Sequence, residues 1–283
     1  MTENINLKNK EFNVKEIFLS PDEDYLGDRT KYIGATDISE ECIAKTIKSK
    51  TLKSTETISE TQQITFILGH MFEDKLAIKL KQHNYNFVRE YIANHDEYNI
   101  TAHPDFYIID NDYIVECKTT ARNITEVYDK YKIQVQFQLG MMRYKKFNTN
   151  KAKIIALNFT NKEMVEEEIT YDESIFKELM QKAFYILNKI NLNEPLEESD
   201  YHFSYLCPFC PFKNQCEKYI NSSDEFTPEL INKIDEYIKL SAFYTEIWKK
   251  KEELRQFIAE YGNFEYYHNK TKIICNSGRL SVY

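Results

Sequence analysis

Residues 103–118 read HPDFYIIDNDYIVECK, and they predict a β-hairpin. One apolar, β-branched and aromatic run follows Asp105, and after a polar turn a second run carries Glu116 and Lys118. Two such runs joined by a short polar turn are typical of a hairpin. Because side chains alternate between the faces of a strand, Glu116 and Lys118 share one face while Cys117 points to the other. We therefore expect two carboxylates and a lysine to converge near one edge of a sheet.

The residue types in this hairpin suit a hard divalent cation. Mg²⁺ and Mn²⁺ prefer carboxylate, carbonyl and water oxygens, which Asp105, Glu116 and the backbone carbonyl of Cys117 would supply. Such an ion lowers the pKa of a bound water and neutralises charge on a phosphate. The Lys118 ammonium would orient that water or stabilise the transition state. The alternative is an ordinary amphipathic hairpin with charged residues on its wet face.

Pro104-Asp105 followed by Glu116-x-Lys118 resembles the motif of the PD-(D/E)xK nuclease superfamily. More narrowly, residues 32–220 resemble the RecB-type nucleases, including the CRISPR-associated iron–sulfur exonucleases and the AddB nuclease domain. The lambda-type phage exonucleases are the next relatives. The resemblance implies an α/β fold, namely a restriction-endonuclease-like core with a mixed central sheet flanked by helices. It also implies a metal-dependent deoxyribonuclease acting as an exonuclease at single-stranded DNA ends.

The segment ITFILGHMFEDKLAIKL, residues 64–80, predicts a helix that supplies another metal ligand. Its His70 and Glu73 lie three residues apart and therefore share a face. The RecB-type family has a histidine four residues after a glycine on this helix, and the lambda-type group has a glutamate there. Four residues after Gly69 stands Glu73, so the resemblance assigns Glu73 as the ligand and His70 as its neighbour or substitute. The alternative is a surface Glu73 with His70 packed in the core.

A helix predicted over residues 123–146 carries Gln134, Gln138 and Met142 along one stripe, with Tyr131 one turn before Gln134. Amide and phenol groups beside a metal site can hold water and phosphate without adding charge. The resemblance to the Gln-x-Gln motif of the lambda-type group assigns Gln134 first to the catalytic set. The alternative is a polar stripe on an amphipathic helix. The expected catalytic set comprises Glu73, Asp105, Glu116, Lys118 and Gln134.

Cys207, Cys210 and Cys216 form a C-x2-C-x5-C arrangement that points to metal rather than to disulfides, because residues 1–16 lack the apolar core of a signal peptide. In the iron–sulfur exonucleases one cysteine precedes the nuclease core and three follow it. The resemblance therefore implies Cys42 as a fourth ligand of a [4Fe–4S] cluster that joins the two ends of the domain. Four thiolates suit zinc equally well by ligand chemistry. Cys275 is expected in a polar tail.

The formal net charge of −8 argues against a generic nucleic-acid coat. Metal-dependent nucleases can be acidic, because local basic strips steer the substrate. Three lysine strips are present: Lys45, Lys48, Lys50 and Lys53; Lys145, Lys146, Lys151 and Lys153; and Lys249 to Lys251. Without an 18-residue apolar run or a signal core, the chain is expected to be cytoplasmic, with DNA as its partner and no membrane segment.

The expected organisation is an N-terminal extension over residues 1–31, a nuclease domain over 32–220, and a long helix with a short strand pair over 221–283. The first helix of the nuclease domain has Thr36 or Asp37 as its candidate cap. The helix predicted over 227–262 would pack on the core, lean over DNA, recruit a protein partner or self-associate.

Two other functions compete with the iron–sulfur exonuclease. A lambda-type recombination exonuclease acting on duplex ends is favoured by Glu73 and the Gln-x-Gln motif and opposed by the four cysteines. A non-catalytic nucleic-acid-binding module stapled by zinc would need the cysteines but not Lys118.

Overall fold

The structure, a computed structural model, describes residues 15, 18–19, 27–52, 59–122, 124–204, 206–221, 228–260, 263–268, 271–276 and 279–282. The chain divides into two compact units, residues 1–220 and 221–283. Most of the predicted N-terminal extension lies outside the described residues. None of the helices in the described part of the chain combines the length and apolar composition needed to cross a bilayer.

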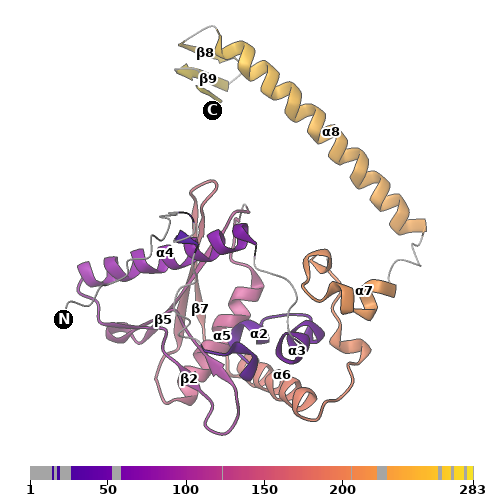
Figure 1. Cartoon of the computed structure of the whole chain (residues 1–283). Coiled ribbons are helices and arrows are strands. Elements are labelled where there is room, and N and C mark those ends of the chain that lie inside the picture. Colours follow the sequence, from indigo (N-terminus) through magenta and orange to yellow (C-terminus); the bar gives the residue numbers. More distant parts are fainter. Residues whose placement is uncertain are drawn as a thin grey trace, which may run out of the picture. The chain divides into compact units, whose positions relative to one another are not determined.

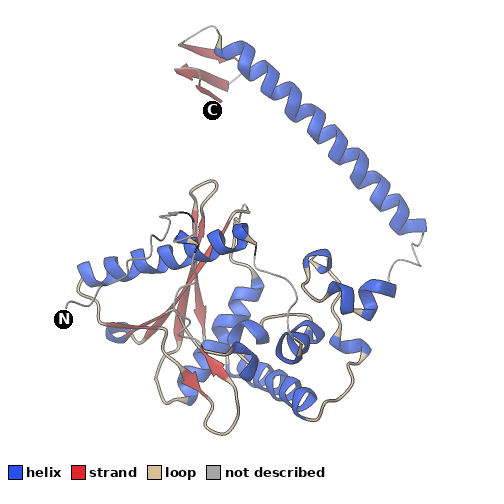
Figure 2. Cartoon of the chain, viewed as in Figure 1, coloured by secondary structure: helices blue, strands red, loops and turns tan. Residues whose placement is uncertain are grey.

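A five-stranded sheet in the order β1-β4-β5-β6-β7 forms the centre of the first unit (Figures 1 and 2). The strands are β1 Phe87–Arg89, β4 Phe106–Ile108, β5 Tyr113–Thr120, β6 Lys151–Asn158 and β7 Met164–Thr170. Strands β5 and β6 are parallel and the other neighbours are antiparallel. The predicted mixed sheet is therefore confirmed. A separate short ladder pairs β2 Ala93–Asn94 with β3 Thr101–Ala102.

The hairpin predicted from the stretch 103–118 is formed by β4 and β5, with Phe106 opposite Val115 and Ile108 opposite Tyr113. A short 3₁₀ turn, η2 Ile109–Asn111, connects the strands. Asp112 then adopts a left-handed backbone with φ 50°. Aspartate is one of the few residues that tolerate this conformation, so the polar turn suits the connection.

Helices cover both faces of the sheet. On one face α4 Glu60–Gln82 packs its Ala77 with Phe106, Ile108 and Cys117. On the other face α5 Asp129–Tyr144 and α6 Glu173–Asn191 form the main core together with Ile114 and Ile154. Ile114 and Cys117 both lie on β5 but belong to different clusters, because alternate positions of a strand face opposite sides. Glu116 therefore shares the α5 side of the sheet with Ile114.

The entry segment forms two helices, α2 Ala35–Ile38 and α3 Ile43–Thr51, rather than one. The predicted caps Thr36 and Asp37 are wrong, since Gly34 caps α2 and Cys42 caps α3. Asp37 instead lies inside α2, where its carboxylate accepts the Gly34 N–H at 2.8 Å and pairs with Lys50 at 2.7 Å. A carboxylate in the first turn that reaches back to the cap residue is the second half of a capping box.

Gly140 of α5 lies directly against α6, and a Cβ at this position would overlap the Phe176 ring. We expect Gly140→Ala to lower the free energy of unfolding by about 1–3 kcal/mol, because the overlap outweighs the better helix propensity of alanine. Gly69→Ala is the matched control, since a Cβ there would meet only Thr119 Oγ1 at 3.8 Å. Urea denaturation monitored by circular dichroism measures the free energy of unfolding of both variants. Equal midpoints for the two variants would contradict the packing argument.

The second unit consists of α8 Pro228–Ala259 and three strands, β8 Phe264–His268, β9 Thr271–Asn276 and β10 Arg279–Val282. The strands form an antiparallel sheet in the order β10-β9-β8, which adds one strand to the predicted pair. Cys275 of β9 is fully buried, so its prediction as part of a polar tail is wrong. The reason is its register: Cys275 pairs with both Phe264 and Leu280 in the middle strand of the sheet.

Candidate active site

Three carboxylates converge beside the end of strand β4. Glu73 comes from α4, Glu90 follows β1, and Asp105 precedes β4. One oxygen of each lies within 4.8 Å of the others, and all three residues are partly buried. The structure thus brings the predicted Glu73 and Asp105 together although 31 residues of mixed structure separate them in the chain.

Glu90 is absent from the residues predicted from sequence, because the run NFVREYIAN indicates only a strand. Its backbone is left-handed, with φ 52°, which is uncommon for a residue other than glycine. The Glu90 N–H donates to the Asp105 carbonyl at 3.1 Å, and the neighbouring Arg89 pairs with Phe106 across the β1–β4 ladder. This pairing ties Glu90 to Asp105. An acidic residue within a strand-like run carries no signal of a metal ligand by itself.

Glu116 is buried, with 1% of its surface exposed, and both of its carboxylate oxygens accept hydrogen bonds. Lys118 Nζ and Gln134 Nε2 each donate to Oε1 at 2.6 Å, and Gln138 Nε2 donates to Oε2 at 2.8 Å. The predicted Glu116, Lys118 and Gln134 therefore form one network, to which the structure adds Gln138. Among the described residues, Glu116 lies outside the group of three carboxylates.

Burial and charge repulsion together raise the pKa values of two of these carboxylates. Burial and then the nearby Glu116 raise the pKa of Asp105 well above its usual value. Burial and then Glu90 raise the pKa of Glu73. A buried group of carboxylates with raised pKa values is stabilised by a cation placed among them.

Lys118 stays protonated in this environment. Burial favours the neutral amine, but the attraction of Glu116 and Asp105 is stronger and raises the pKa of Lys118. The Lys118 ammonium also lies 5.3 Å from the centre of the Tyr131 ring, a cation–π contact from the turn before Gln134. Lys118 is therefore suited to donate hydrogen bonds rather than to accept a proton.

The backbone of Cys117 borders the same group. Asp105 Oδ2 accepts the Cys117 N–H at 2.7 Å. Since the N–H and C=O of one strand residue point to the same side of the strand, the Cys117 carbonyl faces the edge where Asp105 lies. The side chain of Cys117 is buried in the core, as its alternation predicted.

His70 is exposed on α4 and is not part of the three-carboxylate group, so the alternative of a His70 packed in the core is wrong. Its charge still acts on Glu73, whose pKa it lowers. The group of Glu73, Glu90 and Asp105 itself offers oxygen ligands, which fits a hard divalent cation. Among the described residues, Gln138 Oε1 and His103 Nδ1 are buried without a hydrogen-bond partner. Buried polar atoms of this kind are usually satisfied by water or a ligand.

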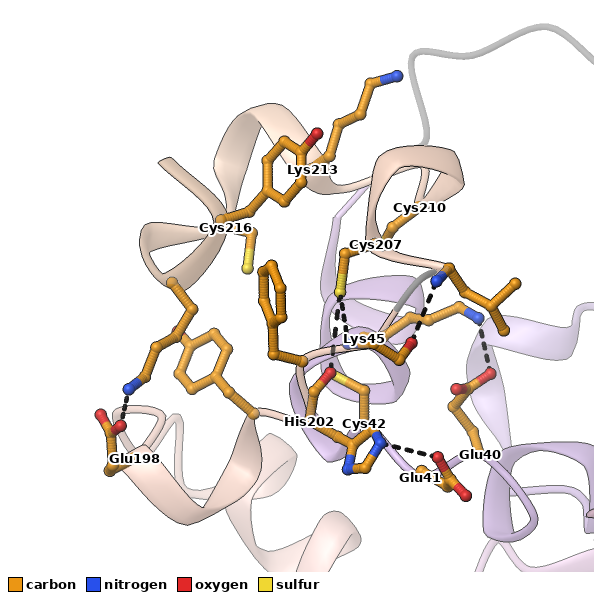
Figure 3. A pocket seen from close by; sticks show the side chains of 16 residues that line it. Glu40, Glu41, Cys42, Lys45, Glu198, His202, Cys207, Cys210, Lys213 and Cys216 are labelled. Atoms are coloured by element: carbon orange, nitrogen blue, oxygen red, sulfur yellow. Dashed lines mark hydrogen bonds and ion pairs between the residues drawn. The ribbon is translucent and has the colours of Figure 1, made fainter. Parts of the chain in front are cut away.

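A second cluster joins Cys42 to the three later cysteines. All four line one cavity of about 290 Å³, together with aromatic side chains such as Tyr201 and Phe203 (Figure 3). Every one of the four is a free thiol. The segment before α3 and the segment after α6 therefore meet at this cavity. No three of the four sulfur atoms lie within 4.8 Å of one another, although all four residues belong to the described part of the chain.

Several lysines of the predicted basic strips are neutralised by carboxylates. Lys145 pairs with Asp96, Lys151 with Glu168 and Lys153 with Glu166, each at 2.6 Å. Lys45 pairs with Glu40 at the same distance. These lysines therefore contribute less attraction for DNA than their number suggests.

No family model and no curated protein matches this chain. Among solved structures, SSO0001 is 20% identical with a TM-score of 0.50, over 72% of this chain and 94% of that chain. The alkaline exonuclease LHK-Exo from Laribacter hongkongensis is 13% identical with a TM-score of 0.44, over 59% and 91%. A phage-related exonuclease from Haemophilus somnus 129PT is 12% identical with a TM-score of 0.41, over 57% and 94%. The likeness to SSO0001 extends over nearly all of that chain and shows a shared fold.

Proposed function

We propose that this chain is a metal-dependent deoxyribonuclease of the PD-(D/E)xK superfamily that acts as an exonuclease. The observation that carries the proposal is the group of Glu73, Glu90 and Asp105 beside the buried Glu116–Lys118 pair. The hairpin motif Pro104-Asp105 and Glu116-x-Lys118 and the mixed sheet support the same assignment.

Different residues have different roles in the proposed reaction. Glu73, Glu90, Asp105 and the Cys117 carbonyl would hold Mg²⁺ or Mn²⁺, which supplies an activated water and neutralises phosphate charge when bound. Glu116 and the amides of Gln134 and Gln138 fix the position of Lys118. Because Lys118 keeps its proton, it donates hydrogen bonds to the phosphate oxygens as negative charge develops on them.

The substrate we propose is DNA with a free end. The resemblance to the iron–sulfur exonucleases favours a single-stranded end. The second candidate is a lambda-type exonuclease acting on duplex ends. One observation favours it: Glu73 occupies the ligand position where the RecB-type family has histidine, and His70 lies outside the carboxylate group. The two candidates predict different substrates, single-stranded DNA ends for the first and duplex ends for the second.

For the cysteine cavity we propose a [4Fe–4S] cluster held by Cys42, Cys207, Cys210 and Cys216, with zinc as the alternative. A tetrahedral zinc site with Zn–S bonds of about 2.3 Å requires sulfur atoms about 3.8 Å apart. Around the cavity of about 290 Å³, no three of the four described sulfur atoms lie even within 4.8 Å of one another. The wider spacing favours the larger cofactor, whose cysteines bind different corners of a cluster.

The experiment is a nuclease assay with end-labelled single-stranded, duplex and circular DNA in Mg²⁺ or Mn²⁺. We expect linear DNA to be degraded, circular DNA to persist, and EDTA to stop the reaction. Lys118→Ala should reduce the rate roughly 100- to 1,000-fold while circular dichroism is unchanged. Lys132→Ala is the matched control, since Lys132 lies on α5 and pairs with Glu167 at 3.0 Å. DNA binding without metal-dependent hydrolysis by the wild-type protein would overturn the proposal in favour of a non-catalytic binding module.

A further inference from the structure

Helix α8 carries an apolar stripe that the catalytic proposal does not use. Its residues recur at alternating spacings of three and four: Tyr237, Leu240, Tyr244, Ile247, Lys251, Leu254 and Ile258. This is the a/d pattern of a coiled coil, interrupted once by a lysine at an a position. Tyr237 is 72% exposed, Leu240 60% and Tyr244 71%. The stripe therefore has the periodicity of a helix that packs lengthwise against another helix.

The exposed area is of the size that a stable dimer buries. Nine large hydrophobic side chains between Tyr237 and Phe257 are exposed, and all except Ile238 fall on one half of the helix. Aromatic residues bury about 150–250 Å² each, so this half offers on the order of 800 Å², the usual contribution of one partner. Monomeric proteins rarely expose an apolar patch of more than a few hundred Å².

The C-terminal end of the stripe lies in a groove between α8 and the small sheet. Ile247, Leu254 and Ile258 line it from the helix, and Ile273 lines it from β9. The basic side chains Lys250, Lys251 and Arg255 also line this groove. An apolar helix segment that carries an acidic residue at its flank fits the groove by both shape and charge.

The N-terminal half of the same stripe is such a segment. Tyr237 and Leu240 supply the apolar side chains, and Glu236 stands beside them. In an antiparallel pair in which Tyr244 faces Ile247 of the second copy, Tyr237 lies opposite Leu254.

The charges oppose a parallel pair. Parallel pairing would place the two Lys251 side chains in the same core layer and Lys250 beside Arg255 of the second copy. In the antiparallel register each Lys251 lies opposite Leu240, where its aliphatic stem packs while the ammonium reaches water. Like charges across an interface are unfavourable, so the antiparallel orientation is preferred.

We propose that α8 pairs antiparallel with α8 of a second copy of this chain. Tyr237 and Leu240 of each copy then occupy the groove formed by Leu254 and Ile273 of the other. The pairing makes the protein a dimer with two nuclease units joined through their C-terminal helices.

Light scattering coupled to size exclusion tests the proposal on the full chain. At about 50 µM, well above the dissociation constants typical of interfaces of this size, we expect twice the mass of 33.8 kDa. Leu240→Glu and Ile247→Glu should weaken the dimer about 30-fold or more. Ile238→Glu is the matched control, since Ile238 is 57% exposed but lies off the stripe. A wild-type monomer at this concentration, or equal weakening by Ile238→Glu, would overturn the proposal, whatever else covers the stripe.

Disulfide cross-linking tests the orientation. In the antiparallel register Tyr237 lies opposite Leu254 of the second copy, so Tyr237→Cys mixed with Leu254→Cys should form a cross-linked dimer that neither variant forms alone. Non-reducing gel electrophoresis, with the wild type as the background, measures the cross-linked fraction. Cross-linking of Tyr237→Cys with itself would rule out the antiparallel register, because only a parallel pair places the two Tyr237 positions opposite each other.

Discussion

Asp105→Asn is expected to reduce DNA hydrolysis roughly 1,000-fold, the equivalent of several kcal/mol of lost metal-dependent stabilisation. Asp105 is one of the three carboxylates whose oxygens lie within 4.8 Å of one another. An amide keeps the shape and can still accept the Cys117 N–H, but it removes the negative charge that a divalent cation needs. End-point and initial-rate assays in Mg²⁺ and Mn²⁺ measure the loss. Asp129→Asn is the control, because Asp129 is exposed and pairs only with Lys132 among the described residues.

The same substitution is expected to stabilise the metal-free protein. The folded-state pKa of Asp105 is raised by burial and by Glu116, so ionising this group costs free energy in the folded chain. Asn avoids that cost, and we expect the melting temperature in EDTA to rise by about 2–4 °C for each kcal/mol recovered. A lower melting temperature for Asp105→Asn in EDTA would show that the attraction between the Asp105 carboxylate and Lys118 outweighs the cost of burying the charge.

The sign of the pH dependence follows from the same shifts. Because Asp105 and Glu73 have higher pKa values in the folded than in the unfolded chain, their contribution to stability in EDTA is greatest below their unfolded pKa values and is lost as pH rises through the folded ones. Mn²⁺ should reverse the trend, since cation binding requires the ionised carboxylates. Melting temperatures at a series of pH values, in EDTA and in Mn²⁺, measure the two pH trends. Asp105→Asn should flatten the curve in EDTA.

Cys216→Ala is expected to remove the bound metal and to lower the melting temperature by roughly 10 °C, the effect of losing a tightly bound group from a domain of this size. Cys216 is one of four free thiols around one cavity, and the cavity joins the segment before α3 to the segment after α6. Loss of one thiolate therefore releases both the cofactor and the contact between the two ends of the unit.

Absorbance and metal content of anaerobically purified protein measure this effect. We expect a visible absorption band and about four irons per chain in the wild type. Both should be lost in Cys216→Ala and kept in Cys275→Ala, the matched control with a buried thiol in the second unit. A colourless wild type with one zinc ion per chain would replace the iron–sulfur cluster by zinc.

The spacing of residues within a single strand or helix was sufficient to predict several features of the fold. The alternation in residues 103–118 predicted the hairpin, the burial of Cys117 and the common face of Glu116 and Lys118. The spacing of the amides predicted that Gln134 and Gln138 share one stripe of a helix, as they do on α5, where both bond the same carboxylate. These relations depend on contacts within one strand or one helix, or between neighbours in a hairpin, so the sequence determines them.

The remaining features of the fold and of the site depend on contacts between segments that are distant in the sequence. Glu90 reaches Asp105 only because the edge strand β1 pairs with β4 and the chain then turns through a left-handed residue. The exposure of His70, the burial of Cys275 and the break between α2 and α3 likewise depend on which distant segment lies alongside. Periodicity tells which face of an element is apolar, whereas the choice of partner for that face depends on packing over the whole unit. The carboxylate group at the sheet edge is therefore a property of the folded chain, assembled from residues that the sequence alone shows only one at a time.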